Sequence, residues 1–266
     1  MGASPGTPGN TTPALGAGVA VSALAHPGLV YPRLIAHRGG GSAAPENTLA
    51  AIRAGHAAGF AGVEFDAMLS LDGTPFLIHD ETLERTTNGR GTVAAASDAR
   101  LAGLDAGSWH SPAYGGEPLP TLDQALGLCR ELGLWVNLEI KPSRGQEVKT
   151  GAAVARVASL AGWPALVLSS FSAAALEAAR QVAPELPRAW LVHGVPGDWR
   201  ASMARLDAQA LHCSEQGLSK ERAVDILDRG FRLACYTVND RRRLEELLSW
   251  GVSAVFTDRL DFAGEG

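Results

Sequence analysis

The segment WVNLEIKPSRGQEVKTGAAVARVASLAGWPALVLSS, residues 135–170, decides the fold class because it reads as strand, helix and strand in turn. Trp135–Ile140 and Leu166–Ser170 are short apolar runs, and Lys149–Ala161 between them has apolar residues at helical spacing. Gly162 follows that stretch, where a left-handed backbone would end a helix. Two strands joined through a helix run parallel in one sheet. The segment therefore predicts one βαβ unit.

The same rhythm of short apolar runs and helical stretches continues from Leu34 to the end of the chain. With the two strands above, the sequence predicts eight, and eight strands alternating with helices indicate a closed (β/α)₈ TIM barrel of the α/β class rather than an open sheet. The six other predicted strands are Leu34–His37, Gly62–Asp66, Ala189–His193, Ala208–His212, Arg232–Val238 and Ala254–Thr257. The six other predicted helices are Thr48–Ala58, Leu122–Leu132, Ala173–Val182, Trp199–Leu206, Lys220–Arg229 and Arg241–Trp250.

One connection between predicted strands contains a short turn instead of a helix. Leu71–Thr74 contains Asp-Gly, a tight-turn signal, and separates the run Glu64–Ser70 from the run Pro75–His79. So few residues cannot reach a parallel neighbour, so we expect an antiparallel hairpin whose second arm returns His79 to the barrel rim. A long irregular stretch rich in Gly and Pro follows. We expect residues 67–120 to stand over the barrel mouth as a hairpin and loop, and loops of such length are usually functional or mobile.

Composition narrows the class of protein. Lys and Arg total 23 and Asp and Glu total 28, so the net charge is 23 − 28 = −5 without a basic block, which argues against nucleic acid as a partner. Apolar residues make up 46% of the 266 residues, enough for a substantial core. Cys129, Cys213 and Cys235 are far apart in the sequence and odd in number, so we expect buried thiols in a reducing compartment and no disulfide framework.

The first residues differ in composition from the rest. Residues 1–30 are rich in Gly, Pro, Ala and Thr, which predicts a flexible leader before a single barrel domain over residues 31–266. No Lys or Arg precedes Arg33, so the charged start of a secretory signal is missing and a cytoplasmic location is favoured. The Ala-rich stretch Ala14–Ala25 leaves a secreted or periplasmic location as the alternative. No apolar run approaches the roughly 20 residues that span a bilayer.

Charged and titratable side chains interrupt the apolar runs where the first strands end. Enzymes of the barrel class place their working residues at the C-terminal ends of strands. Residues i and i+2 of a strand face the same side, so Glu64 points with Asp66 and Glu139 with Lys141. Three carboxylates should therefore converge at one mouth. The groups in question are His37, Arg38, Glu64, Asp66, His79, Glu139 and Lys141.

These residue types suit phosphoryl chemistry. Oxygen ligands without cysteine favour a hard divalent cation such as Mg²⁺, Ca²⁺ or Mn²⁺. Arg38 and Lys141 are donors matched to a phosphate, and two imidazoles exchange protons near neutral pH. Taken singly, each group could instead cap a backbone group or form a rim salt bridge. Taken together, so many buried charges would be costly without a ligand. His193 and His212 also end predicted strands, but no partner is next to either in the sequence.

At these positions the sequence resembles the glycerophosphodiester phosphodiesterase family, whose motifs occur here in the family's order. The resemblance extends from Leu34 to the end of the chain and is strongest in the first half. It implies a metal-dependent TIM barrel that hydrolyses glycerophosphodiesters to sn-glycerol 3-phosphate and an alcohol. The matching segments are Ala36–Gly39, Pro45–Thr48, Gly62–Asp66, Asp72–Gly73, His79–Asp80, Arg85–Gly89, Leu104–Trp109, Pro120–Leu122, Glu139–Lys141 and Tyr236–Asn239.

The resemblance also implies roles for single residues. His37 and His79 would be the acid/base pair, and Arg38 and Lys141 would contact phosphate. Glu64, Asp66 and Glu139 would hold one divalent ion, Mg²⁺ or Ca²⁺, with Mn²⁺ possible. Glu46 either reaches the substrate site or orients Arg38 or a backbone amide. Tyr236, where the family often has tryptophan, would pack against the leaving alcohol. Asn47 is expected to be an N-cap, with a substrate contact as the alternative.

Three readings of the function remain at this point. The favoured one is an enzyme acting on a small-molecule glycerophosphodiester, and the substrate's own 2-hydroxyl is the nucleophile that the resemblance implies. A phosphodiesterase acting on lysophospholipids would need an apolar groove or an interfacial helix, and no basic amphipathic helix is visible in the sequence. A non-catalytic phosphate-binding barrel would be expected to lack one of the histidines, and both are present. The oligomeric state stays open.

Overall fold

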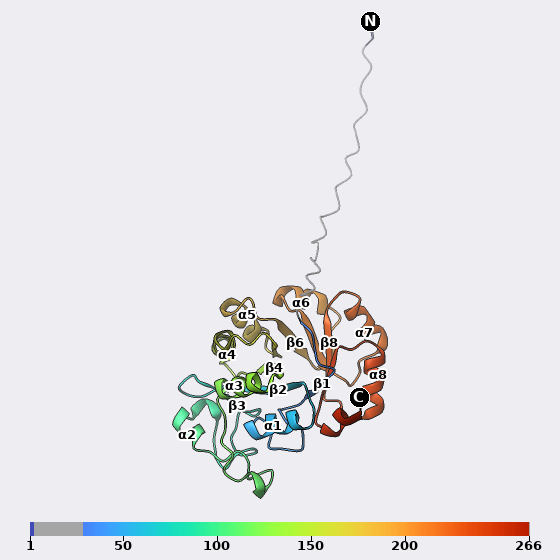
Figure 1. Ribbon diagram of the computed structural model, residues 1–266. Helices are drawn as coiled ribbons and strands as arrows, with labels where there is room; N and C mark the ends of the chain where they lie inside the picture. Colours follow the sequence, from blue (N-terminus) through green and yellow to red (C-terminus); the bar gives the residue numbers. More distant parts are fainter. Residues whose placement is uncertain (3–28, 266) are drawn as a thin grey trace.

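A computed structural model describes residues 1–2 and 29–265 of the chain. Of the predicted leader, residues 1–30, all but residues 1, 2, 29 and 30 lie outside the described residues. Within the described residues the chain forms a ring of strands surrounded by helices (Figure 1). In this part of the chain no helix has the length and apolar character that crossing a membrane requires.

Eight parallel strands close into the predicted (β/α)₈ barrel. Neighbouring strands follow the order β1-β9-β8-β7-β6-β5-β4-β2, and a further pairing of β1 with β2 closes the ring. Seven of the predicted strands start within one residue of the observed start, whereas β7 starts at Ala210 instead of Ala208. The barrel strands are β1 Leu34–Ala36, β2 Gly62–Leu69, β4 Trp135–Ile140, β5 Leu166–Ser170, β6 Arg188–Val192, β7 Ala210–Ser214, β8 Arg232–Tyr236 and β9 Ala254–Thr257.

The predicted hairpin is confirmed. Strand β2 continues past the ring and pairs in antiparallel register with β3, Pro75–Leu77, with Ala67 opposite Leu77. Gly73 allows the tight turn because its φ of 89° lies in the left-handed region. The Ile78 amide donates to the Asp66 carbonyl at 3.1 Å. This bond brings the following residue, His79, back to the level of the carboxylates on β2.

The long stretch after the hairpin is largely irregular, as predicted, and has a small core of its own. It contains α2, Asp98–Ala102, and two short 3₁₀ turns, Val93–Ala95 and Pro112–Tyr114. Its apolar residues pack with Met68 and Phe76 of the hairpin. The stretch also contacts the loop after β1, where the His110 ring lies 3.1 Å from the Ser42 carbonyl.

Helices cover the outside of the ring and follow the predicted positions closely. The N-cap of α1 is Thr48, whose hydroxyl accepts from the Ala51 amide, so the prediction of Asn47 as the cap is wrong. Asn47 has a left-handed backbone, with a φ of 59°, and its side chain bonds Asp66 instead. The helices are α1 Leu49–Ala57, α3 Leu122–Leu132, α4 Glu147–Ala161, α5 Ala173–Val182, α6 Trp199–Leu206, α7 Lys220–Leu227 and α8 Arg241–Ser249, and a 3₁₀ segment, Leu260–Glu265, follows β9.

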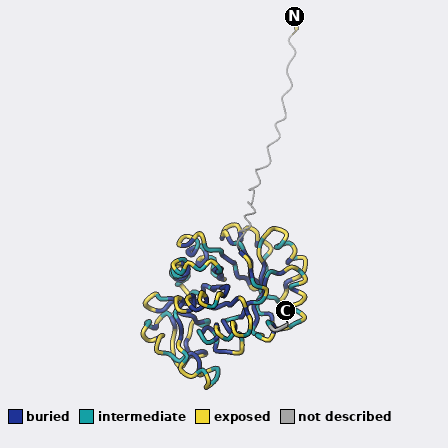
Figure 2. Tube along the Cα trace, viewed as in Figure 1, coloured by how far each residue is buried: buried dark blue, intermediate teal, exposed yellow. Residues whose placement is uncertain are grey.

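The core lies mainly between the strands and the surrounding helices (Figure 2). A smaller cluster inside the barrel contains Tyr31 and Trp135, whose ring centroids are 4.6 Å apart. Tyr31 also bonds the ring of His212 across 2.8 Å, and both side chains are buried. His212 therefore lies in the middle of β7 and belongs to the core. The three cysteines are buried and free, as predicted.

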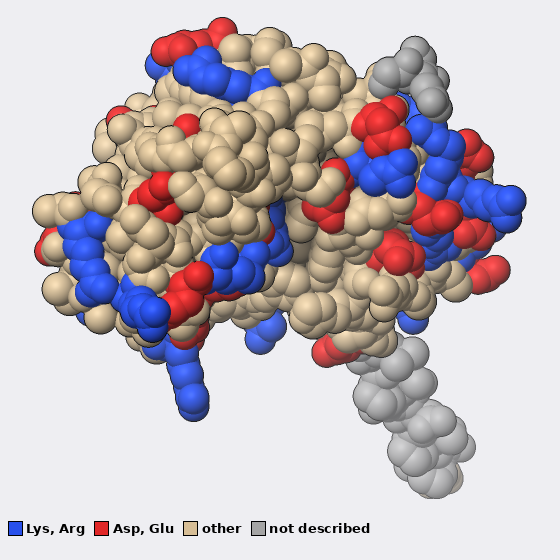
Figure 3. Space-filling view, turned by 90° about the horizontal axis from the view of Figure 1, so that it is seen from below, with Lys and Arg blue, Asp and Glu red and all other residues tan. Residues whose placement is uncertain are grey.

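Charges of both signs are mixed over the face shown in Figure 3, where Lys and Arg alternate with Asp and Glu. That face carries no continuous basic band of the kind that would bind a polyanion. The charges that matter for chemistry are instead gathered at the ends of the strands.

Candidate active site

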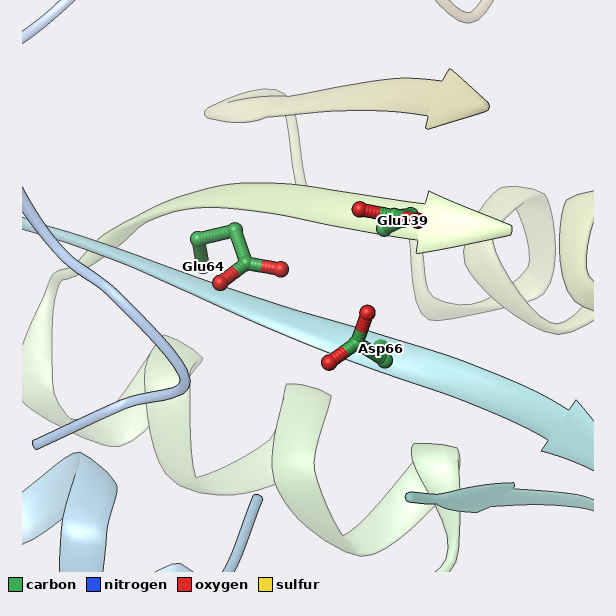
Figure 4. A group of neighbouring side chains, drawn as sticks. All are labelled: Glu64, Asp66 and Glu139. Carbon is green, nitrogen blue, oxygen red and sulfur yellow. The ribbon is translucent and has the colours of Figure 1, made fainter. Parts of the chain in front are cut away.

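Three carboxylates meet inside the barrel mouth. Glu64 and Asp66 come from β2 and Glu139 from the adjacent β4, where Asp66 pairs with Glu139 in the strand register. One oxygen atom of each carboxylate lies within 4.8 Å of the others (Figure 4). Side-chain alternation along the two strands is the cause, because these positions all face inward. We call Glu64, Asp66 and Glu139 the acidic triad.

The acidic triad carries more negative charge than the protein around it balances. Burial and the charge of Asp66 raise the pKa of Glu64 to about 7. The same two causes raise the pKa of Glu139 well above its usual range. Burial also acts on Asp66, but Lys141, His79 and Arg38 outweigh it and lower the pKa of that carboxyl. Three buried oxygen donors with excess negative charge fit a hard divalent cation.

Two cationic side chains border the acidic triad. The Lys141 ammonium lies 3.3 Å from Asp66 Oδ1 and 3.6 Å from Glu139 Oε1. Arg38 lies on the other side, where its backbone amide donates to Glu64 Oε2 at 2.8 Å and its Nε is 4.0 Å from Asp66 Oδ2. That Nε is buried and has no hydrogen-bond partner among the described residues. An unpaired guanidinium donor beside the triad is suited to a phosphate oxygen.

Glu46 forms an ion pair with Arg38. Its Oε1 accepts from Arg38 Nη1 at 2.7 Å, and both of its oxygens accept from Arg85, at 2.9 and 2.7 Å. Of the two readings left open by the sequence, the contacts made by Glu46 match the one in which it positions the arginine. Arg85 was not predicted as a site residue, although its motif Arg85–Gly89 was recognised.

His37 directly follows β1 and faces the acidic triad with one nitrogen. Its Nε2 lies 3.9 Å from Glu64 Oε2, and its Nδ1 lies 2.7 Å from Asp258 Oδ1. Burial works against a charged imidazole here. The hydrogen bond to Asp258 and the charge of Glu64 outweigh that effect and raise the pKa of His37.

His79 returns to the mouth on the hairpin arm, as predicted. Its Nδ1 lies 2.6 Å from Asp80 Oδ1, and Arg85 also binds the Asp80 carboxylate. Burial lowers the pKa of His79, and the nearby charges of Lys141 and Arg38 act in the same direction. The two histidines therefore have pKa values shifted in opposite directions, an arrangement typical of acid/base pairs.

Tyr236 lies at the end of β8 in a small aromatic cluster. Its hydroxyl donates to the Val192 carbonyl at 2.8 Å, so the ring is held in place. Phe171 meets that ring edge-on at a centroid distance of 5.9 Å and stacks on His193 at 4.8 Å. Phe171 is 39% exposed. The cluster therefore offers apolar ring surface at the ends of β5, β6 and β8.

Four supporting residues were not found by sequence reasoning. Asn47 donates to Asp66 Oδ2 at 2.9 Å and accepts from the Asp66 amide at 3.0 Å. Asp80 and Asp258 each bond one histidine, and Asn239 donates to Asp258 Oδ2 at 2.8 Å. Asn47, Asp80 and Asn239 stand inside recognised motifs. Asp258 stands outside them, and its partner is 221 positions away.

Comparison with known proteins gives consistent matches over most of the chain. The sequence profile described as "Glycerophosphoryl diester phosphodiesterase family" matches residues 37–262. A glycerophosphodiester phosphodiesterase of Caldanaerobacter subterraneus subsp. tengcongensis is 31% identical over 229 residues, covering 85% of this chain and 93% of that protein. A glycerophosphodiester phosphodiesterase of Bacillus subtilis is 30% identical over 265 residues, covering 91% of this chain and 89% of that protein.

A solved structure extends the similarity to the fold. It is a phosphodiesterase of Oleispira antarctica in complex with the product sn-glycerol-3-phosphate, 38% identical to this chain with a TM-score of 0.82. The match covers 88% of this chain and 95% of that one.

Proposed function

The chain belongs to the glycerophosphoryl diester phosphodiesterase family, and on that premise we propose that it hydrolyses glycerophosphodiesters to sn-glycerol 3-phosphate and an alcohol. The observation that carries this proposal is the acidic triad, bordered by Arg38 and Lys141 and flanked by two histidines. The sn-glycerol-3-phosphate bound to the Oleispira antarctica relative supports the choice of product. Residues 31–266 would form the catalytic domain.

Glu64, Asp66 and Glu139 would hold one divalent cation, Mg²⁺ or Ca²⁺, and Mn²⁺ also suits the oxygen ligands. Their fit to a cation rests on their mutual distance and on the raised pKa values of the two glutamates. When bound, such an ion stabilises negative charge on phosphoryl oxygens. Asn47 would keep Asp66 aimed at the ion through its two hydrogen bonds.

Arg38 and Lys141 would bind the phosphate. The unpaired Nε of Arg38 and the Lys141 ammonium lie on either side of Asp66, within 4.0 and 3.3 Å of its carboxylate oxygens. Donors fixed in position before the substrate arrives stabilise the developing charge without reorganising during the reaction. Glu46 contributes to this by holding the Arg38 guanidinium.

The two histidines would move the protons. One imidazole takes the proton from the 2-hydroxyl of the glycerol moiety, whose oxygen then forms a bond to phosphorus. The bond from phosphorus to the alcohol oxygen breaks, and the other imidazole protonates that oxygen. The products of this step are a cyclic 1,2-phosphate and the free alcohol. Water then opens the ring, with the proton roles of the histidines exchanged.

The departing alcohol would lie against the aromatic cluster of Tyr236, Phe171 and His193. The ring of Tyr236 is fixed by its hydroxyl bond, and Phe171 is partly exposed. An aromatic surface accepts both apolar groups and quaternary ammonium groups. Glycerophosphocholine is therefore the first substrate to test.

The test is a matrix of cations and substrates. Metal-stripped protein is supplied with Mg²⁺, Ca²⁺ or Mn²⁺ and with glycerophosphocholine, glycerophosphoethanolamine or lysophosphatidylcholine. Released glycerol 3-phosphate is measured with a coupled dehydrogenase, and free choline is measured separately. We expect glycerol 3-phosphate from the first two substrates with at least one cation. Release of glycerol 3-phosphate from none of the combinations, or choline release from lysophosphatidylcholine alone, would overturn the proposal.

A further inference from the structure

The carboxylate of Asp258 lies behind the His37 ring, away from the acidic triad. Asp258 Oδ1 is 2.7 Å from His37 Nδ1, whereas the opposite ring nitrogen, Nε2, faces Glu64 Oε2 at 3.9 Å. The ring therefore connects a carboxylate on one side with the reaction site on the other. A carboxylate without a proton can only accept at that distance, so His37 Nδ1 carries the hydrogen.

Asp258 is itself held by Asn239, in the segment that connects β8 with α8. Asn239 donates to Asp258 Oδ2 at 2.8 Å, and the oxygen of the same amide accepts from the Asp258 backbone at 2.8 Å. That amide oxygen also accepts from the Thr257 hydroxyl at 3.1 Å. The backbone of His37 joins the same unit, because its amide donates to the Thr257 carbonyl at 3.0 Å. Ring, carboxylate and amide thus form one connected group.

We propose that Asp258 is the positioning residue of His37. It fixes the tautomer in which Nδ1 carries the hydrogen and Nε2 is left to accept a proton at the reaction site, and Asn239 fixes the carboxylate in turn. This inference rests on the proposed function insofar as it takes His37 as a catalytic residue.

The two histidines are held by carboxylates in different settings. Asp80, behind His79, is bound by the Arg85 guanidinium through both of its oxygens, at 2.5 and 3.0 Å. The second oxygen of Asp258 is bound by the neutral Asn239 amide. A change at Asp258 therefore acts on His37 without disturbing the Arg85 network that holds His79 and Glu46.

The decisive variant is Asp258→Asn. Asn239 still offers an N–H to the position of Oδ2, so the new amide turns its oxygen there and its NH₂ toward His37 Nδ1. The ring must then accept at Nδ1 and carry its hydrogen at Nε2, the wrong tautomer for a base. We expect kcat to fall about 100-fold or more because general base catalysis is lost. KM should change little because Arg38 and Lys141 are untouched.

A second readout does not depend on turnover. In protein labelled with ¹⁵N-histidine, NMR reports which ring nitrogen of neutral His37 bears the hydrogen, and His37→Gln assigns the signal. We expect the hydrogen on Nδ1 in the unsubstituted protein and on Nε2 in Asp258→Asn. Asp261→Asn is the matched control, because Asp261 is an exposed carboxylate three positions away that pairs with Arg259. It should preserve both kcat and the tautomer.

Asn239→Ala provides a variant that keeps the charge of Asp258. It removes one hydrogen bond from the carboxylate, so we expect kcat to fall about tenfold with the Nδ1 tautomer retained. An unchanged tautomer in Asp258→Asn, or kcat within about threefold of the unsubstituted protein in that variant, would overturn the inference. Absence of phosphodiesterase activity in the unsubstituted protein would instead reject the proposed function, and the NMR readout would still decide whether Asp258 fixes the ring.

Discussion

Glu46 Oε1 lies 2.7 Å from Arg38 Nη1, and this ion pair holds the guanidinium beside the acidic triad with its Nε unpaired. Arg85 binds the same carboxylate from the other side and continues to Asp80. Arg38, the proposed phosphate contact, and Asp80, which bonds His79, therefore belong to one network of charges. A change at Glu46 should therefore weaken substrate binding, although Glu46 lies outside the acidic triad.

The first prediction concerns that pair. Glu46→Gln removes the negative charge and one of the two acceptor oxygens that Arg38 and Arg85 share, so the side chain holds the Arg38 guanidinium more weakly. We expect KM for glycerophosphocholine to rise about tenfold, the effect of losing one charged hydrogen bond. Initial-rate kinetics measure it, with Glu131→Gln, an exposed position on α3, as the control. A KM within about twofold of that control would contradict the role of Glu46.

The second prediction concerns the cation. Asp66→Asn removes the negative charge of one proposed oxygen ligand, a charge that also pairs with Lys141, so divalent-cation affinity should fall about tenfold or more. Calorimetric titration of metal-stripped protein measures the affinity directly. Glu245→Gln, an exposed acid on α8, should bind the cation as the unsubstituted protein does. Undiminished turnover after exhaustive chelation would rule out metal dependence.

The third prediction concerns the histidines. His37→Ala and His79→Ala should each lose roughly 100-fold to 10,000-fold in kcat while keeping the fold and the cation site. Circular dichroism and metal titration check the second part. His56→Ala is the control, because His56 is exposed on α1. If either variant keeps its turnover, that histidine has a structural role.

The fourth prediction tests the nucleophile. A propane-1,3-diol phosphodiester lacks the 2-hydroxyl and is otherwise matched to the natural substrate. We expect it to bind with similar affinity, as a competitive inhibitor, and to turn over negligibly, because the attacking oxygen held within the substrate is missing. Hydrolysis at a comparable kcat would mean that water attacks phosphorus directly.

The fifth prediction concerns stability and pH. Burial lowers the pKa of His212 to about 3, whereas an unfolded histidine has a pKa of about 6.5. Below about pH 6.5 the unfolded chain binds a proton that the folded chain does not. This residue's contribution to the free energy of unfolding is therefore complete above that pH and falls by roughly 1.4 kcal/mol per pH unit down to about pH 3.

Urea denaturation at pH 7 and at pH 5 tests this expectation. His212→Gln should show a smaller loss of stability between the two conditions than the unsubstituted protein, by roughly 2 kcal/mol. His56→Ala, which changes an exposed histidine, should show the full loss. Equal losses in all three proteins would mean that His212 takes up a proton in the folded state.

The sequence was sufficient for the parts of the molecule that depend on local pattern. Apolar runs of strand length located all eight barrel strands, and the i, i+2 spacing in β2 predicted that Glu64 and Asp66 meet Glu139. Asp-Gly at the turn predicted the hairpin that returns His79. Helix α2, with five residues, is too short to show a period and was not predicted.

Partners that are distant in the sequence could not be predicted in this way. The position of Asn47 just before α1 predicts a helix cap, yet its left-handed backbone turns the side chain to Asp66. The predicted strand Ala208–His212 would place His212 at a strand end. In the structure β7 runs from Ala210 to Ser214, and that shift places His212 in the core beside Tyr31. Neither contact follows from spacing, because each depends on how separate segments pack.

Because β1 pairs with β9, residues from the first and the last barrel strands lie together at the candidate site. All three residues of the acidic triad lie within residues 64–139, on the adjacent strands β2 and β4. His37 and Asp258 meet only when the last strand closes the ring. During synthesis, a nascent chain that ends before β9 contains all three residues of the acidic triad but lacks the aspartate that bonds His37. The proposed positioning of His37 is therefore available only to a chain that has been synthesised through β9 and Asp258.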